Sequence, residues 1–230
     1  LTFPNIDLVR DLSFSSGGFQ SKYGDKMSSV LDVKYKRPDS LRASASGSLL
    51  GASAHLEGSL RAKKDNYRTF RYLVGARYKT TRNLLGSLDL QGEYVPSFTD
   101  VQAYLTYDLN RNWQVAAIGN FNRSFYQFVP ESLERAFGLI DFALKLTTTF
   151  EGQQVDDFTQ AMSGVSLTYL PDRERNPFYH KVLASTWRSQ ENERFDILGS
   201  YVLGEVDENL GSGNFGDIVN ILGKGTQHTW

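Results

Sequence analysis

Residues 100–109 read Asp-Val-Gln-Ala-Tyr-Leu-Thr-Tyr-Asp-Leu and alternate between two kinds of side chain. Val101, Ala103, Leu105, Tyr107 and Leu109 share one face, and more polar residues share the other. A period of two is typical of a β-strand that presents different surfaces on its two sides. The segment Asn110-Arg111-Asn112 supplies a short polar turn, and a second alternating run follows it. The stretch therefore predicts a tight antiparallel hairpin.

The second strand of this hairpin is unusually long. Its apolar face carries Trp113, Val115, Ala117, Phe121 and Phe125, its polar face carries Gln114, Asn120, Asn122 and Ser124, and Ile118 is the exception. About 12 steps of about 3.3 Å, tilted by near 40°, rise roughly 30 Å, which is the height of a bilayer core. An apolar face of that height predicts a lipid-facing strand, although a strand of a soluble sandwich would alternate in the same way.

Composition favours a β-rich chain and excludes several classes of function. The 230 residues contain 13% aromatic residues and 20 glycines, which is typical of strands and turns. The formal charge of −1 argues against binding nucleic acid through bulk charge. Zero cysteines and three scattered histidines exclude thiol chemistry and argue against a zinc site. No apolar run approaches the length of a membrane-spanning helix.

Further alternating segments predict eight to ten strands in all. Two short strands are expected, one before and one after Gly51. The alternation changes phase there, which favours a turn over a bulge. The other candidate strands are 70–79, 158–170 and 177–189, with weaker ones at 139–150, 195–204 and 216–223. The long connections are expected at 84–98, 127–138 and 190–216. Segment 138–158 fits neither pattern, and one long external loop is the alternative to a strand there.

Residues 16–38 carry a more specific pattern. Gly17, Gly18 and Phe19 are followed by Tyr23-Gly24, two small residues and an alternating strand at 30–35. This order resembles the end of the plug domain of TonB-dependent outer-membrane receptors, where the plug leads into the first barrel strand. Many members carry Gly-Gly where this chain has Ser28-Ser29, so the match is to a variant of the motif. Residues 92–98 and 223–230 also resemble the barrel of that family.

The resemblance implies an all-β fold of antiparallel strands from a transmembrane β-barrel, which has 22 strands in the family. Residues 1–37 would be the C-terminal end of the plug, and 38–230 the first eight to ten barrel strands with long extracellular loops. The barrel would then be incomplete in this chain. The implied function is uptake of a solute too large or too scarce for porins, across the outer membrane of a Gram-negative bacterium.

The implied partners are outer-membrane lipid and a TonB-type energy-transducing protein, whose recognition box is not in these residues. A surface lipoprotein is a further candidate partner, and no enzyme activity, cofactor or metal is expected. Two alternatives stay open from the sequence. One is a receptor-like barrel that serves secretion or assembly, and the other is a soluble β-sandwich that binds carbohydrate or protein through aromatic loops.

No other group of residues predicts a catalytic or substrate-binding site. His55, His180 and His228 lie far apart and fit no hydrolase or metal pattern. The glycine-containing segments 211–213 and 223–225 lack the spacing of phosphate loops and are expected to be turns. The basic residues Arg42, Arg71, Arg77 and Lys79 are expected to line a wet interior. A hard cation is a weaker alternative for the acidic residues Asp156, Asp157, Glu191, Glu193, Asp196, Glu205, Asp207 and Glu208.

Overall fold

A computed structural model gives the fold of the chain and describes residues 5–18, 20, 23–24, 28–62, 67–81, 93–139, 142–171, 178–207 and 213–229. In these residues the protein is all-β, with eleven strands and one 3₁₀ turn. The elements are η1 Ile6–Leu8, β1 Val9–Ser15, β2 Val30–Tyr35, β3 Arg42–Ser48, β4 Gly51–Arg61, β5 Thr69–Thr80, β6 Glu93–Asp108, β7 Trp113–Val129, β8 Leu133–Leu139, β9 Phe142–Tyr169, β10 His180–Val206 and β11 Ile218–Thr229. Across these residues, no helix has the length and apolarity needed to cross a membrane.

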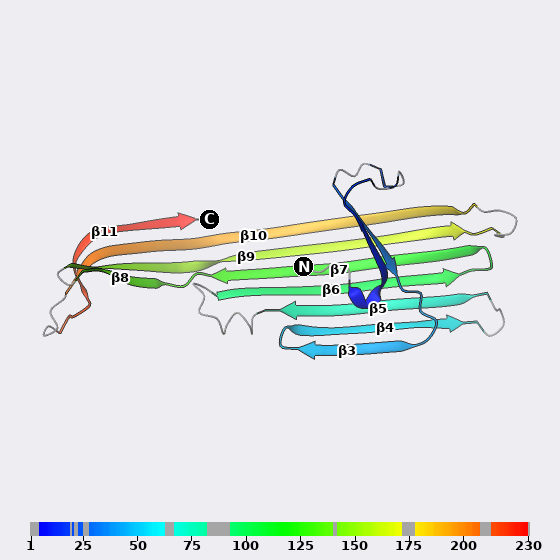
Figure 1. Cartoon of the computed structure of the whole chain (residues 1–230), viewed down its shortest axis with the longest axis horizontal. Coiled ribbons are helices and arrows are strands. Elements are labelled where there is room, and N and C mark those ends of the chain that lie inside the picture. The colour runs from blue at the N-terminus through cyan, green and yellow to red at the C-terminus, as the bar shows by residue number, and fades with distance from the viewer. Residues whose placement is uncertain are drawn as a thin grey trace. The chain divides into compact units, whose positions relative to one another are not determined.

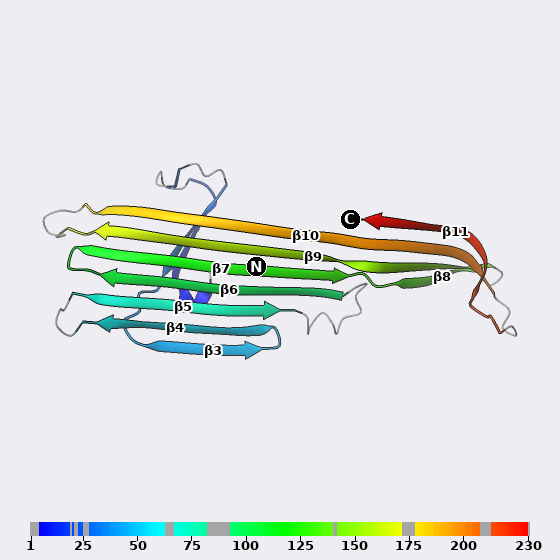
Figure 2. The same cartoon turned by 180° about the vertical axis from the view of Figure 1, so that it is seen from behind.

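The strands form two sheets (Figure 1). β1 and β2 pair antiparallel in a two-stranded sheet. The other nine strands form a second sheet in the order β11-β10-β9-β7-β6-β5-β4-β3, with β8 paired to β9 beside this path. Figure 2 shows the same neighbour-to-neighbour order from behind. The prediction of an all-β fold with antiparallel strands is confirmed.

The chain divides into two compact units. The first contains residues 1–79, 98–123 and 159–190, and the second contains residues 80–97, 124–158 and 191–230. Strands β1 to β4 belong wholly to the first unit, and β8 and β11 belong wholly to the second. The site described below lies within the first unit.

The hairpin of β3 and β4 confirms the predicted change of phase. Arg42 pairs with Glu57 at one end of the hairpin, and Ser48 pairs with Gly51 at the other. Leu49 and Leu50 form the turn between the strands. Gly51 has a φ of 136°, and a Cβ there would lie 2.0 Å from the backbone oxygen of Tyr78. The turn therefore needs glycine at this position.

Several strands are longer than the sequence indicates. β9 has 28 residues and β10 has 27, so the predicted breaks inside 139–170 and 177–204 are wrong. Gly152 has a φ of 94°, which shifts the side-chain phase inside β9 and hides its continuity from a search for period two. In β10, residues 189–194 are polar on both faces, so no alternation marks the middle of the strand. Strands β6, β7, β8 and β10 accordingly take up part of the predicted connections 84–98, 127–138 and 190–216.

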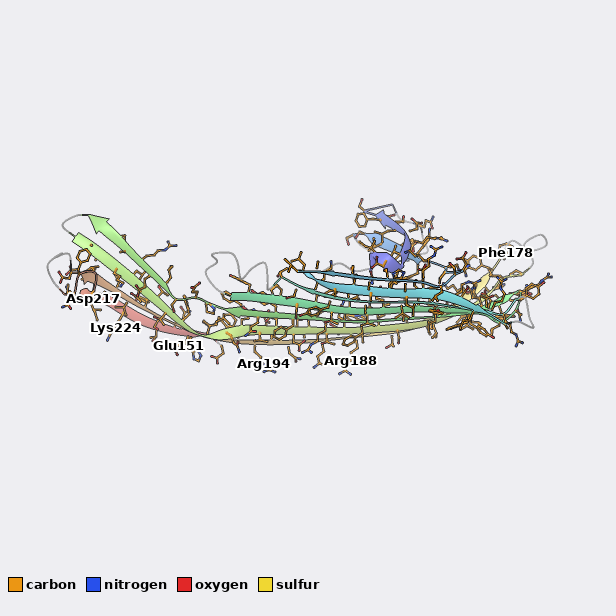
Figure 3. The ribbon with its side chains drawn as sticks, turned by 90° about the horizontal axis from the view of Figure 1, so that it is seen from below. Glu151, Phe178, Arg188, Arg194, Asp217 and Lys224 are labelled. Atoms are coloured by element: carbon orange, nitrogen blue, oxygen red, sulfur yellow. The ribbon has the colours of Figure 1, made fainter. Side chains whose placement is uncertain are left out.

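Polar side chains dominate the buried part of the described residues. The buried apolar side chains are Leu8, Leu73 and Ala116, whereas the buried polar ones are Asn5, Glu57, Thr69, Arg77, Asp100, Gln102, Thr106 and Asn122. On the opposite face of β6 and β7, Val101 is 40% exposed and Phe121 is 44% exposed. Phe178, which precedes β10 in the sequence and is labelled in Figure 3, is 73% exposed. In β6 and β7, the polar side is therefore covered and the apolar side is uncovered.

The Gly51 turn gives a test of the hairpin. Gly51→Ala should lower the free energy of unfolding by about 1–3 kcal/mol, because the new methyl group meets backbone at an unfavourable φ. Gly47→Ala is the matched control, since no atom lies within 4 Å of a Cβ at that strand position. It should leave stability unchanged or raise it by up to about 1 kcal/mol. Equal midpoints for both variants in chemical denaturation would contradict the turn geometry.

Candidate functional site

The predicted motif residues join β1 to β2. Gly18 has a φ of 59°, in the left-handed region that glycine tolerates best. The Tyr23 hydroxyl donates to Asp32 Oδ2 at 2.8 Å, which ties the connection back to β2. Gly17 and Gly24 lie in the same connection, whereas Phe19 lies outside the described residues. The role of these residues as a plug motif stays a prediction.

A buried cluster centred on Asp100 occupies the polar side of β5, β6 and β7. Arg77 donates from Nε at 3.0 Å and from Nη2 at 2.8 Å to Asp100 Oδ2. Gln102 Nε2 lies 3.0 Å from Asp100 Oδ1, and Asn120 Nδ2 lies 3.4 Å from the same oxygen. Asp100 is 0% exposed and Arg77 is 7% exposed. The charge-assisted contacts balance two charges that would otherwise be costly to bury.

The N-terminal segment, meaning the described residues between 5 and 38, packs against this polar side. The Tyr35 ring stacks on Tyr104 with centroids 5.3 Å apart, and its hydroxyl donates to Gln102 Oε1 at 3.5 Å. Burial raises the pKa of the Tyr35 phenol, and the nearby Asp100 and Tyr104 raise it further. The phenol therefore stays protonated at neutral pH and acts as a donor. Arg37 adds a contact from Nη2 to Gln114 Oε1 at 2.6 Å.

A second contact of the N-terminal segment lies over Gly75 of β5. A Cβ at Gly75 would lie 2.7 Å from Asn5 Nδ2 and 3.1 Å from a methyl group of Leu8. Because Gly75 has no side chain, Asn5 and Leu8 can approach β5 closely. Figure 3 shows the small β1–β2 sheet on one side of these strands, while side chains project from both sides.

Some polar atoms beneath the segment lack partners. Asn5 Nδ2, His55 Nε2 and Glu57 Oε2 are buried without a hydrogen bond. The last two lie 3.7 Å apart, and His55 Nδ1 shares a hydrogen bond of 2.6 Å with Ser44 Oγ. Between the segment and the sheet, the polar atoms around Asp100 are thus hydrogen-bonded, whereas some of those around His55 are not.

The structure keeps the three histidines apart. His55 lies on β4, His180 stacks on Tyr169 with centroids 6.4 Å apart, and His228 Nε2 lies 2.7 Å from Asp196 Oδ1. The acidic residues are also dispersed, since Asp156 bonds Gln154 and Glu205 bonds Asn220. Glu208 lies outside the described residues. Within the described ranges, no three His, Cys, Asp or Glu side chains gather as metal ligands would.

Three of the four predicted basic residues have separate acidic partners. Arg71 bonds Asp108, Arg77 bonds Asp100, and Arg42 Nε lies 3.9 Å from Glu57 Oε1. Lys79 is exposed. The segment 223–225, expected to be a turn, instead lies inside β11 and pairs with residues 201–203, so that prediction is wrong. Gly211 and Ser212 of the other glycine-containing segment lie outside the described residues.

Sequence reasoning missed the central acid of the cluster. Asp100 stands at the start of the alternating run, and the alternation alone gives it no partner. Its contact with Arg77 spans 23 residues and depends on the pairing of β5 with β6. Alternation predicts only that each side chain lies on a polar face. The register of β5 against β6 brings the two side chains into contact.

Comparison with known proteins gives no match: no family model, no curated protein and no solved structure is similar to this chain.

The Asp100 cluster gives a stability prediction. Asp100→Asn should lower the free energy of unfolding by about 3–5 kcal/mol, because the buried Arg77 guanidinium would lose the carboxylate that accepts from its Nε and Nη2. Adding Arg77→Met should recover part of the loss, since it removes that charge. The control is Asp11→Asn, whose exposed partner Lys34 lies 3.1 Å away. That change should cost less than about 1 kcal/mol. Similar losses for Asp100→Asn and Asp11→Asn in equilibrium denaturation would contradict the cluster.

Proposed function

We propose that the chain forms part of a TonB-dependent receptor in the outer membrane of a Gram-negative bacterium. In this proposal residues 38–230 belong to the wall of a transmembrane β-barrel, and residues 1–37 are the end of its plug. The receptor takes up a solute too large or too scarce for porins. An inner-membrane complex supplies the energy through a TonB-type protein.

The observation that carries the proposal is the reversed burial of the two faces. Asp100 and Gln102 are 0% and 1% exposed, while Val101, between them in sequence, is 40% exposed. A water-soluble sandwich buries the apolar faces of its sheets and turns the polar faces outward. A transmembrane barrel does the opposite, because lipid surrounds its apolar face and water fills its interior. The pattern supports the barrel over the sandwich.

Aromatic side chains at the strand ends support the same orientation. Trp113, the first residue of β7, packs on Tyr169, the last residue of β9, with ring centroids 4.9 Å apart. Trp113 is 38% exposed beside the short turn 110–112. Tryptophan and tyrosine form girdles where a barrel meets the membrane surface, so this pair fits one interface.

The N-terminal segment supports its assignment as part of a plug. Its contacts with Gln102, Tyr104 and Gln114 are hydrogen bonds and ring stacking. Contacts of this kind exchange readily with water, unlike a large apolar core. They suit a segment that leaves the wall when solute passes. In the barrel, the outer edges of β3 and β11 pair with further strands, because unpaired backbone groups are costly in lipid.

The proposal predicts where a new charge is harmful. Phe121 stands near the middle of β7 on the uncovered apolar face. Phe121→Arg should lower stability in lipid vesicles by about 2–4 kcal/mol, because the guanidinium would face the bilayer centre. The control is Ser46→Arg on β3, where every residue is exposed and Ser46 bonds Ser53 on the polar side. It should change stability by less than about 0.5 kcal/mol.

A cell-fractionation measurement accompanies these variants. The full-length protein should stay in the outer-membrane fraction through an alkaline carbonate wash. Phe121→Arg should reduce the amount recovered there, and Ser46→Arg should not. Release of the unmodified protein into the soluble fraction would contradict the proposal, as would equal tolerance of arginine at both positions.

A further inference from the structure

A charged pocket lies at the short-turn end of the first unit. It has a volume of about 590 Å³, and the linker after β2, the facing ends of β4 and β5, and the β6–β7 turn all contribute to it. Its charged residues are Arg37, Arg61, Arg71, Arg111, Asp39 and Asp108. Four arginines against two aspartates give the lining a formal charge of +2.

Part of this charge is already balanced. Arg71 bonds Asp108, and Gln114 Nε2 donates to the other oxygen of the same carboxylate. Gln114 in turn accepts from Arg37 at 2.6 Å. This chain of contacts satisfies both oxygens of Asp108, so its carboxylate is not free to neutralise the other arginines.

Gln114 is neutral, so three arginines, Arg37, Arg61 and Arg111, remain against one carboxylate, Asp39, and they carry the surplus charge of +2. The Arg111 guanidinium lies 4.7 Å from the centre of the Tyr67 ring, which orients it without using its N–H donors. Arg61 is exposed at the end of β4 and makes no ion pair with any described residue.

A neutral donor joins these arginines in the turn. Asn110 Oδ1 accepts the backbone N–H of Asn112 and of Trp113, both at 2.9 Å. Its oxygen is thus occupied by the turn, and its NH₂ group remains a donor. The pocket combines surplus cations and hydrogen-bond donors with few free acceptors.

We infer that this pocket binds a water-borne oxyanion of the phosphate class. Guanidinium groups hold phosphate through paired N–H donors, and Arg37, Arg61 and Arg111 have no carboxylate partner among the residues that the structure describes. The volume exceeds that of one phosphate group, so a phosphate ester fits as well as the free ion. Arg71, Asp108 and Gln114 belong to the polar side of the sheet, which favours an ion from water over a lipid headgroup. The inference does not depend on the proposed function.

The test is calorimetric titration of the purified full-length protein with inorganic phosphate at low ionic strength. Saturable binding is expected, and added salt should weaken it. Arg61→Gln and Arg111→Gln should each weaken binding about tenfold or more, because each removes a charge-assisted contact. Arg135→Gln is the matched control, since Arg135 is exposed on β8 and outside the pocket. It should change affinity by less than about twofold.

Three results would overturn the inference. The first is an absence of saturable phosphate binding by the unmodified protein. The second is an equal loss in Arg61→Gln and Arg135→Gln. The third is binding that occurs only to phosphatidylglycerol in mixed micelles and not to free phosphate, which would assign the pocket to lipid. Tyr67→Leu adds a check on geometry: it keeps every charge, and it should weaken binding by releasing Arg111. Unchanged circular dichroism spectra show that the variants fold.

Discussion

The Asp100 carboxylate is enclosed by protein, and Arg77, Gln102 and Asn120 donate to it. These donors come from β5, β6 and β7, so one side chain links three neighbouring strands. A register shift of one residue in any of them would turn a partner to the opposite face. Polar contacts therefore set the register here, in place of the apolar packing that usually does so.

The N-terminal segment completes this polar side. Tyr35 lies on Tyr104 and reaches Gln102, and the missing side chain at Gly75 makes room for Asn5 and Leu8. Burial of the cluster thus depends on the segment, and the segment is held mainly by polar contacts. The uncovered apolar face has the opposite requirement, because it needs an apolar environment that the described residues do not supply. The proposed barrel would meet both requirements, with water and solute on one side and lipid on the other.

Period two in the sequence was enough to predict the 100–125 hairpin, the β3–β4 hairpin and β5, because their side chains alternate with few exceptions, such as Ile118. It failed for β9, where Gly152 shifts the phase, and for β10, where the run 189–194 is polar on both faces. The site was harder to predict, because alternation says which face a residue occupies but not which residue lies beside it. The Arg77–Asp100 pair and the charged pocket both join residues that are distant in sequence. The pairing of the strands brings these residues together.

The most direct test of the central claim is a spin-label scan along β7 in lipid bilayers. The chain has no cysteine, so each cysteine introduced between Trp113 and Val129 carries a unique label. Oxygen concentrates in lipid, and a water-soluble nickel complex stays outside it. The account predicts that oxygen accessibility peaks at odd-numbered positions such as Val115 and Phe121, where nickel accessibility is low. Odd-numbered positions that are reached by nickel, or shielded from both reagents, would contradict it.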